Sequence, residues 1–434
     1  MGTQITLELA EMTLTYSKNH MGQDHGCLYQ EGDRKRLRSD QVDYDYFEKT
    51  KEDPALMEMA FARKLKDILP RLNLIGFTRE QAKFSYEAAI ERDREYTSYD
   101  DDEATPARDL MSFDEFCAFV AAHPVETLDN VYDGKKSDEK IKGRFANDPA
   151  LERIPGSSYA HRNAYSERSF FGELIGAIDP YSLLQVLADN PENSEADVVW
   201  QHGPLVEAGW AEDVEFFPCA RRTQTFLIAT EGSSDVHILN YALQVLRPDV
   251  ADFFRFIDVS ESHPFSGTGS LVKFAEGLTK IDVQNQVVFV FDNDAEGYEA
   301  CQKVKRFTLP PNMRAIILPE MEVFRAFPAR GPNGIADADI NKRAAAIECY
   351  LDLSFIKEPQ PHVVWTNYKK EADVYQGALD NKEAHYKAFL KKAAPAIANG
   401  TYDTSKLRAV LESLITECSS IAQGQLHTNN SGLW

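Results

Sequence analysis

The spacing of apolar residues along the chain changes near residue 225. Beyond that point, short apolar runs alternate with stretches in which apolar residues recur every three or four positions. The runs predict strands and the stretches predict helices. The expected strands are TFLIATEG (225–232), FFRFIDVSE (253–261), VVFVFDND (287–294) and MRAIILPE (313–320), and the expected helices cover 233–248, 267–281 and 295–307. This alternation predicts a parallel sheet with right-handed crossovers, and wholly apolar strands indicate that helices cover both of its faces.

The first half of the chain follows a different pattern. Apolar alternation from Ile5 to Tyr16 predicts a short β-hairpin, and the acidic, proline-broken segment 97–109 predicts an exposed loop. Ser112 and Glu115 have the spacing of a capping box, which predicts the start of a helix. Helices are expected at 55–69, ending before Pro70, and at 79–95, 112–123 and 169–188.

These patterns divide the chain into three parts. We expect a mainly helical α+β domain at 1–221, an α/β domain with a Rossmann-like parallel sheet at 222–395, and a helical tail at 396–434. No stretch is apolar over the roughly 20 residues that a membrane span needs. The first residues also lack the basic region and apolar run of a secretion signal. A cytoplasmic protein with no membrane partner is therefore the expectation.

The net charge and the spacing of the cysteines limit the kinds of site and partner that the chain can have. The net charge is -22, and residues 1–221 hold 25 Lys and Arg against 43 Asp and Glu, a balance of -18. Such a surface repels phosphates, so any nucleic-acid contact must use local basic patches, metal ions or a partner. No cysteine pair has CxxC spacing and no histidine pair has HExxH spacing, which argues against a zinc site and a disulfide framework and fits a reducing cytoplasm. The six cysteines are Cys27, Cys117, Cys219, Cys301, Cys349 and Cys418.

Acidic residues stand at the ends of two predicted strands. Glu231 ends the first strand, and Asp292 and Asp294 end the third. The carboxyl ends of parallel strands share one edge of the sheet and neighbouring strands lie about 5 Å apart, so the three carboxylates are expected to converge. Their repulsion is tolerable around a cation, and oxygen ligands without Cys or His select Mg²⁺ or Mn²⁺. Gly232 and Gly297 are expected to leave room beside them.

A simpler interpretation exists for the pair of aspartates. The sequence Asp-Asn-Asp-Ala also fits a turn in which Asp294 caps the following helix. Glu231, at the equivalent end of the first strand, favours the metal-site interpretation, because a helix cap at Asp294 does not require a second acid there.

Several segments together resemble a known family. They are IATEGSSDVHIL, SGTGSLVKF, VFDNDAEG, DINKRAAAIECYLDL and WTNY…YQGALDNK, within residues 222–385. Glu-Gly after one strand and Asp-x-Asp-x-x-Gly after a later one resemble the TOPRIM domain of topoisomerases, primases and overcoming-lysogenization-defect (OLD) nucleases. The layout of the whole chain is similar to that of bacterial HEPN/Toprim N-terminal-domain proteins. The chain has no Arg-x4-6-His ribonuclease motif, so this resemblance implies no HEPN ribonuclease activity.

The resemblance to OLD-type nucleases implies a fuller site. It adds Asp235 and Glu348 to the metal ligands and makes Lys382 a catalytic lysine near the metals. The alternatives are that Asp235 complements the helix dipole, that Glu348 is an exposed helix acid, and that Lys382 is a solvated helix lysine. Asp337 and Asp339 are weaker candidates, and they also fit a loop and a cap. The turn SGTGS (266–270) is interpreted as a tight βα turn near the metal site, where the start of the next helix could bind an anion. The basic stretch Lys387, Lys391 and Lys392 could touch phosphates, or it is a solvated helix face.

The function expected first is a metal-dependent endonuclease. Two metal ions would clamp a phosphodiester of DNA or RNA, including tRNA, and the resemblance implies an anti-phage defence effector. The alternatives are a topoisomerase- or primase-like enzyme, and a non-catalytic metal- or nucleotide-sensing scaffold of a defence complex. The acidic first half suits a protein partner or a homo-oligomer.

Overall fold

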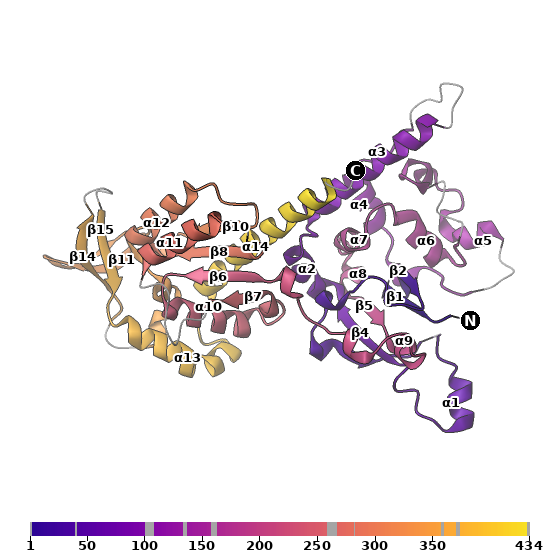
Figure 1. Ribbon diagram of the computed structural model, residues 1–434, viewed down its shortest axis with the longest axis horizontal. Coiled ribbons are helices and arrows are strands. Elements are labelled where there is room, and N and C mark those ends of the chain that lie inside the picture. Colours follow the sequence, from indigo (N-terminus) through magenta and orange to yellow (C-terminus); the bar gives the residue numbers. More distant parts are fainter. Residues whose placement is uncertain are drawn as a thin grey trace. The chain divides into compact units, whose positions relative to one another are not determined.

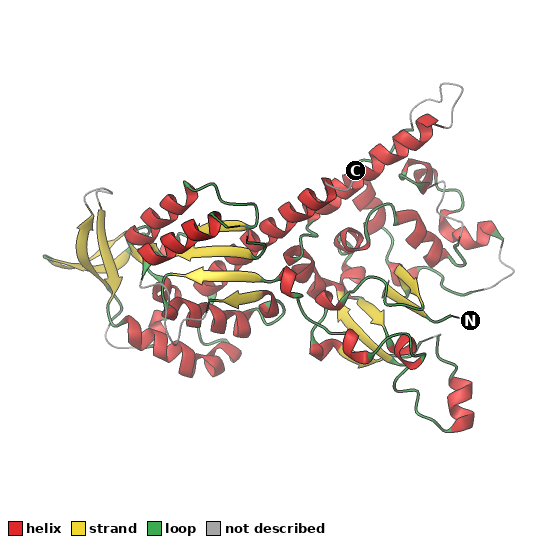
Figure 2. Ribbon diagram, viewed as in Figure 1, coloured by secondary structure: helices red, strands yellow, loops and turns green. Residues whose placement is uncertain are grey.

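The chain forms two compact units, residues 1–220 and 221–434 (Figure 1). The computed structural model describes residues 2–39, 41–99, 108–132, 137–157, 163–257, 267–281, 283–356, 360–369 and 374–431. Each unit contains its own sheet and its own helices, as Figure 2 shows. The units are therefore described one at a time.

A five-stranded antiparallel sheet is the centre of the first unit. Its strands are β1 (Gln4–Leu9), β2 (Met12–Lys18), β3 (Arg34–Arg36), β4 (Met59–Lys64) and β5 (Asp197–Gln201), in the order β2-β1-β5-β4-β3. The predicted hairpin is confirmed as β1 and β2. Its two-residue turn, Ala10 and Glu11, has positive φ at both positions (47° and 62°), as the tightest hairpin turns require. Alternate β1 residues Ile5, Leu7 and Leu9 are buried in the core.

Helices make up most of the rest of the first unit. They are α1 (Tyr44–Thr50), α2 (Leu65–Leu74), α3 (Arg79–Tyr99), α4 (Phe113–Ala121), α5 (Asp138–Lys142), α6 (Glu167–Ile175), α7 (Pro180–Leu187), α8 (Pro191–Glu195) and α9 (Gly203–Glu207). The Ser112 capping box is confirmed, because the Ser112 hydroxyl accepts from the Glu115 N–H and the Glu115 carboxylate accepts from the Ser112 N–H. The loop expected at 97–109 begins later than predicted, since 97–99 belong to α3, and residues 100–107 lie outside the described residues.

Two predicted helices of this unit are wrong in their extent. Residues 59–64 of the helix expected at 55–69 form strand β4, and α2 continues past Pro70 to Leu74. Strand β4 pairs with β5 on one side and β3 on the other, and this pairing buries Phe61 completely, so tertiary context overrides the helical spacing. The helix expected at 169–188 is two helices, because Gly176 ends α6 and Pro180 begins α7.

A four-stranded parallel sheet is the centre of the second unit. Strands β6 (Phe226–Thr230), β7 (Phe254–Phe256), β8 (Gln286–Phe291) and β10 (Met313–Ile317) lie in the order β10-β8-β6-β7, which confirms the predicted parallel sheet. The chain leaves β6 for β7 on one side and returns to β8 on the other. The strand order therefore reverses between β6 and β8, and side chains at the carboxyl ends of these strands face a natural crevice.

Helices cover both faces of this sheet (Figure 1). They are α10 (Ser233–Leu246), α11 (Thr268–Thr279), α12 (Ala295–Lys305), α13 (Lys382–Ala398) and α14 (Ser405–Ser431). On one face, Leu271 of α11 and Val304 of α12 pack with Phe289 and Phe291 of β8. On the other face, α10 packs against β6, and α13 and α14 pack against α10. The residues expected to form a separate tail lie within this unit, where α14 also contacts β10.

A second sheet was not predicted from the sequence. It contains β11 (Phe327–Gly331), β12 (Gly334–Ala338), β14 (Val363–Lys369) and β15 (Val374–Leu379) in the order β12-β11-β14-β15. The short strands β9 (Asn293–Asp294) and β13 (Ala344–Ala345) pair with each other. Asp337 is exposed on β12, and Asp339 accepts hydrogen bonds from the backbone and side chain of Asn341.

The cysteines and the helices each provide one further observation. All six cysteines lie within the described residues, and all six are free thiols. Across the described part of the chain, no helix combines the length and the apolar character that crossing a membrane requires.

Candidate functional site

The two strand ends at the reversal point of the parallel sheet meet through Glu231. This residue follows β6, and its Oε1 accepts a hydrogen bond from the backbone N–H of Asp292, which follows β8, at 3.1 Å. Its Oε2 accepts from the hydroxyl of Thr268, at the start of α11, at 2.7 Å. Glu231 therefore points toward Asp292, and three elements of the sheet and its helices fix its position.

Two buried acids lie beside this pair. Asp235, in the first turn of α10, is 9% exposed, and its Oδ2 accepts from the N–H of Gly232 at 2.9 Å. Glu348 is 3% exposed and lies in the short 3-10 helix Ile347–Tyr350, so the interpretation of Glu348 as an exposed helix acid is wrong. Lys382, the first residue of α13, places its Nζ 3.8 Å from Glu348 Oε1, with its side chain 55% exposed.

The aspartates after β8 accept hydrogen bonds from backbone groups. Asp292 Oδ1 accepts from the N–H of Ile347 at 2.9 Å. Asp294 is the N-cap of α12, because its Oδ1 accepts from the N–H of Gly297 at 2.7 Å, and its Oδ2 accepts from the side chain of Gln376 at 2.6 Å. The capping role considered for Asp294 is thus present, and it occupies one of the two carboxylate oxygens.

Burial, and after it the crowding of negative charges, raises the pKa values of Glu231, Asp235, Asp292 and Asp294. Burial raises the pKa of Asp292 well above its usual range, and the negative charges of the four other acids raise it further. Burial raises the pKa of Glu231 to about 7 against its hydrogen bond from Thr268. Burial, followed by the charge of Glu348, raises the pKa of Asp235 to about 7. The five acids therefore share one electrostatic environment, in which their full ionisation is unfavourable.

The two glycines expected near the acids differ in their importance. A side chain on Gly297 would overlap the backbone oxygen of Asp292 and reach within 2.8 Å of Glu231 Oε1. Only glycine fits there, as expected. At Gly232 the nearest atom to an added side chain is 3.7 Å away, an ordinary contact, so the space beside the acids there does not depend on glycine.

Gln376, which holds part of this site together, was not predicted from the sequence. Gln376 of β15 accepts from the N–H groups of Ala295 and Glu296 at the start of α12 and donates to Asp294. Its contacts are about eighty residues away along the chain, and a buried glutamine in a strand has no recognisable spacing. The turn SGTGS was expected beside the site, and its Thr268 does bind Glu231, whereas Ser266 lies outside the described residues.

Comparison with protein families identifies the chain through its first half. The family model described as HEPN/Toprim N-terminal domain 1 matches residues 1–224. The chain belongs to this HEPN/Toprim N-terminal domain family. Comparison with curated proteins and with solved structures gives no match. The family match ends at residue 224, before the first of the strand-end acids, so the second unit of this HEPN/Toprim protein has to be interpreted from its own residues.

The donor atoms of the HEPN/Toprim protein's acid cluster suit a hard divalent cation. All five candidate ligands offer carboxylate oxygens, which Mg²⁺ and Mn²⁺ prefer. A cation would offset the burial and the mutual repulsion that raise the pKa values of Glu231, Asp235 and Asp292. Within the ranges that the structure describes, however, no three acidic, histidine or cysteine side chains are gathered closely enough to hold a metal ion as they stand. The carboxylates instead accept from N–H and O–H donors, so binding requires some of them to rotate away from these donors.

Proposed function

We propose that the second unit is a Mg²⁺- or Mn²⁺-dependent nuclease whose site is the acid cluster Glu231, Asp235, Asp292, Asp294 and Glu348. The observation that carries the proposal is the contact of Glu231 with the backbone N–H of Asp292 at the point where the strand order reverses. Five acids crowded at this edge are costly in a protein without a positively charged ligand. Membership of the HEPN/Toprim N-terminal domain family agrees with a nuclease or a topoisomerase- or primase-like protein.

The side chains suggest a role for each group in phosphodiester cleavage. Divalent cations held by the five carboxylates would neutralise phosphate charge and activate a water molecule. Thr268 and Gln376 hold two of these acids in position through hydrogen bonds of 2.7 and 2.6 Å. Lys382 is half exposed and within 3.8 Å of the buried Glu348, so its ammonium group can reach a phosphate oxygen without leaving the site. We assign it the role of binding the charged phosphate.

DNA and RNA, including tRNA, both fit as substrates. The acidic first unit does not favour phosphate backbones, so contacts must come from the second unit or from bound cations. Lys391 and Lys392 are exposed on α13, which also carries Lys382, whereas Lys387 forms an ion pair with Glu383 at 2.6 Å. These lysines extend the positive surface away from the acids. The anti-phage role rests on the resemblance and stays a prediction.

One observation favours a second candidate, a non-catalytic metal-sensing scaffold. Asp235 accepts from the N–H of the N-cap residue Gly232 of α10, and Asp294 accepts from the N–H of Gly297 in the first turn of α12, as purely structural capping residues do. In a scaffold these bonds persist when a cation binds, and no phosphodiester is cleaved.

Digestion of nucleic acids separates the two candidates. The full chain is incubated with plasmid DNA, single-stranded DNA, and total RNA including tRNA, with Mg²⁺, with Mn²⁺ or with EDTA. We expect cleavage with either cation and none with EDTA. Asp292→Asn, which preserves size but removes a charge, is expected to lower cleavage about a hundredfold or more, since even the groups that only support metal ligands have effects of about ten- to a hundredfold. The matched control is Asp337→Asn on exposed β12, which is expected to cleave like the parent.

Three outcomes would contradict the proposal. The first is cleavage that persists in EDTA, and the second is an equal loss in Asp292→Asn and Asp337→Asn. The third is metal binding, measured by calorimetry, with every nucleic acid left intact, which would support the scaffold. Relaxation of supercoiled plasmid without cutting would instead indicate the topoisomerase-like alternative.

A further inference from the structure

Three aromatic side chains of the second sheet, Trp365, Tyr368 and Tyr375, lie side by side on strands β14 and β15. Tyr368 stands directly opposite Tyr375 in the register of the two strands, and their ring centroids are 5.1 Å apart. The ring centroid of Trp365 lies 6.3 Å from that of Tyr375. Tyr375 is 57% exposed, Tyr368 is 47% exposed and Trp365 is partly exposed. Single exposed rings are common on proteins, but three adjoining ones, here called the aromatic cluster, form a patch that suits a binding partner.

The backbone of the two strands places the aromatic cluster on one face of the sheet. A bulge between Trp365 and Asn367 shifts the register, so Trp365 and Tyr368 share a face although they are three positions apart. Gly377 stands opposite Trp365, and a side chain at Gly377 would approach the indole to 2.9 Å. The absence of a side chain at Gly377 therefore makes room for the indole, and the register brings the two tyrosines beside it.

The same strands support the candidate metal site. Gln376 lies between Tyr375 and Gly377 and so points to the opposite face, where it donates to Asp294 at 2.6 Å. Figure 1 shows the second sheet beyond the carboxyl ends of β6 and β8, which carry the strand-end acids. Strand β15 thus has the aromatic cluster on one face and a contact with the acids on the other.

Arg343 connects these two regions at the edge of β15. Its backbone oxygen accepts from the N–H of Gly377 at 3.2 Å, and its backbone also forms a bridge with Asp294. Tyr375 is two positions from Gly377, about 7 Å along the strand. The Arg343 side chain is exposed, and within the described ranges it has no ion pair or hydrogen bond. Its positive charge is therefore available to a phosphate between the acids and the aromatic cluster.

These features fit a ligand that carries both flat rings and negative charges. Strands β14 and β15 contain no acidic residue, although the chain has a net charge of -22. Unpaired bases stack on aromatic side chains, whereas the bases inside a duplex are covered by their neighbours. We propose that the aromatic cluster and Arg343 bind single-stranded nucleic acid, with bases against the rings and a phosphate at Arg343. This inference rests on the nuclease function proposed above and names its substrate class.

Binding measured in EDTA tests the inference separately from cleavage. The probe is a fluorescein-labelled single strand of about twelve nucleotides, made as DNA and as RNA, and its polarisation is followed with the full chain. We expect the single strand to bind, and the matching duplex to bind about tenfold more weakly or less. Tyr375→Ala is expected to weaken single-strand binding about tenfold, the effect of losing one stacked base. Tyr375→Phe keeps the ring and is expected to bind like the parent.

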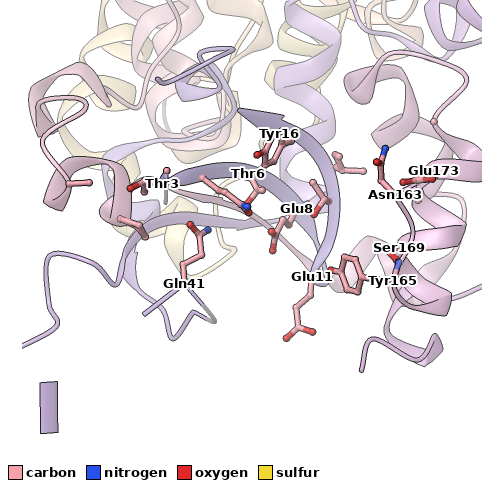
Figure 3. Close-up of a pocket in the computed structure, with 18 of the residues that line it drawn as sticks. Thr3, Thr6, Glu8, Glu11, Tyr16, Gln41, Asn163, Tyr165, Ser169 and Glu173 are labelled. Atoms are coloured by element: carbon pink, nitrogen blue, oxygen red, sulfur yellow. The ribbon is translucent and has the colours of Figure 1, made fainter. Parts of the chain in front are cut away.

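Two matched controls separate the site from general effects. Tyr16→Ala removes a tyrosine of similar exposure (56%) from β2 of the acidic first unit, where Glu8 and Glu173 line the same cavity (Figure 3). It is expected to bind like the parent. Arg343→Gln is expected to weaken binding about threefold and to lower its salt dependence, because one phosphate contact is lost. Arg306→Gln, at the opposite end of α12 from Asp294, changes the net charge equally and is expected to have no effect.

The fluorescence of Trp365 gives a second readout that needs no change to the tyrosines. A base stacked on an indole quenches its emission. Titration with an unlabelled single strand is therefore expected to lower the emission of the parent more than that of Trp365→Phe. Circular dichroism establishes that each variant is folded, and if Tyr375→Ala is not, this comparison decides the question.

Several results would overturn the inference. They are binding by Tyr375→Ala equal to that of the parent, equal weakening by Tyr16→Ala, equal binding of duplex and single strand, and equal quenching in the parent and Trp365→Phe. Loss of a dimer in Tyr375→Ala, with no binding of single strands by the parent, would show that the aromatic cluster contacts a second copy of the chain. Single-strand binding that depends on Tyr375, in a protein that cleaves no nucleic acid, would contradict the nuclease function and support the single-strand site.

Discussion

Replacing Glu231 by glutamine is expected to stabilise the second unit when no divalent cation is present. Burial, together with the charges of Asp294 and Asp235, raises the pKa of Glu231 to about 7 from its usual 4.5. Glutamine has nearly the same shape. Its carbonyl can accept from the Asp292 N–H, and its amide can donate to the Thr268 oxygen, so the hydrogen bonds of the glutamate have counterparts. The substitution therefore removes mainly a charge.

The magnitude and its pH dependence follow from the two pKa values. Below pH 4.5 the acid is neutral in both the folded and the unfolded chain, so its charge has no effect on stability. Between pH 4.5 and 7 the unfolded chain ionises first, and the folded state loses stability as the pH rises; above pH 7 the loss is complete. A shift of this size corresponds to about 3 kcal/mol at most, because the Glu231 side chain keeps some contact with water.

Calorimetric unfolding of the full chain in EDTA measures this effect. At pH 8 the transition of the second unit in Glu231→Gln is expected several degrees above that of the parent, and at pH 4.5 the two are expected to coincide. Added Mg²⁺ should stabilise the parent by mass action and the variant much less. The control is Glu296→Gln, a surface acid of α12 paired with Lys369, which is expected to change stability by less than about 0.5 kcal/mol.

Two results would refute this reasoning. Destabilisation by Glu231→Gln of equal size at pH 8 and pH 4.5 would show that the side chain acts through packing or hydrogen bonding and not through its charge. Equal stabilisation of parent and variant by Mg²⁺ would show that cations bind elsewhere.

Three further predictions concern other parts of the chain. Gly297→Ala is expected to destabilise the second unit by about 2 kcal/mol and to abolish cleavage, because the added methyl group would overlap the Asp292 backbone. The control Gly277→Ala, in open space on α11, is expected to be neutral or stabilising, and denaturant titration measures the stability of both variants. Gln376→Ala is expected to lower the rate of cleavage about tenfold with little effect on substrate affinity, measured as kcat and KM, because it holds a ligand and not the substrate. Burial lowers the pKa of His25 to about 4, so the first unit should lose about 3 kcal/mol of stability as the pH falls from 6.5 to 4. In His25→Gln this pH-dependent loss of stability is expected to be smaller, as measured by acid titration followed by circular dichroism.

The sequence identified the parts of the fold whose pattern is local. Strand β8 is buried along its whole length, so its apolar run was recognisable, and the acids that follow it stood out against that run. The same local patterns misled for β4, whose residues have apolar spacing suited to a helix and become a strand only because β3 and β5 pair with them. Pairing between distant segments decides such cases, and one sequence does not show it.

The site shows the same division between local and distant information. Glu231 and Asp292 were recognisable from their places at strand ends, and the structure brings them into contact. The burial of Glu348 in a 3-10 helix and the hydrogen bonds of Gln376 depend on how the second sheet packs beside α12. No spacing rule relates those residues to the strand ends, so physical reasoning on the sequence had no means of finding Gln376.

The central place of β5 affects how the first unit is made during translation. This strand, residues 197–201, lies between β1 and β4, although it is synthesised long after both of them. Until it leaves the ribosome, the β1–β2 hairpin and the β3–β4 pair each expose an inner edge with unpaired N–H and C=O groups. During most of the synthesis of this unit, the nascent chain therefore exposes two strand pairs with unpaired edges. We expect this state to favour chaperone binding, and we expect chains that terminate before β5 to aggregate.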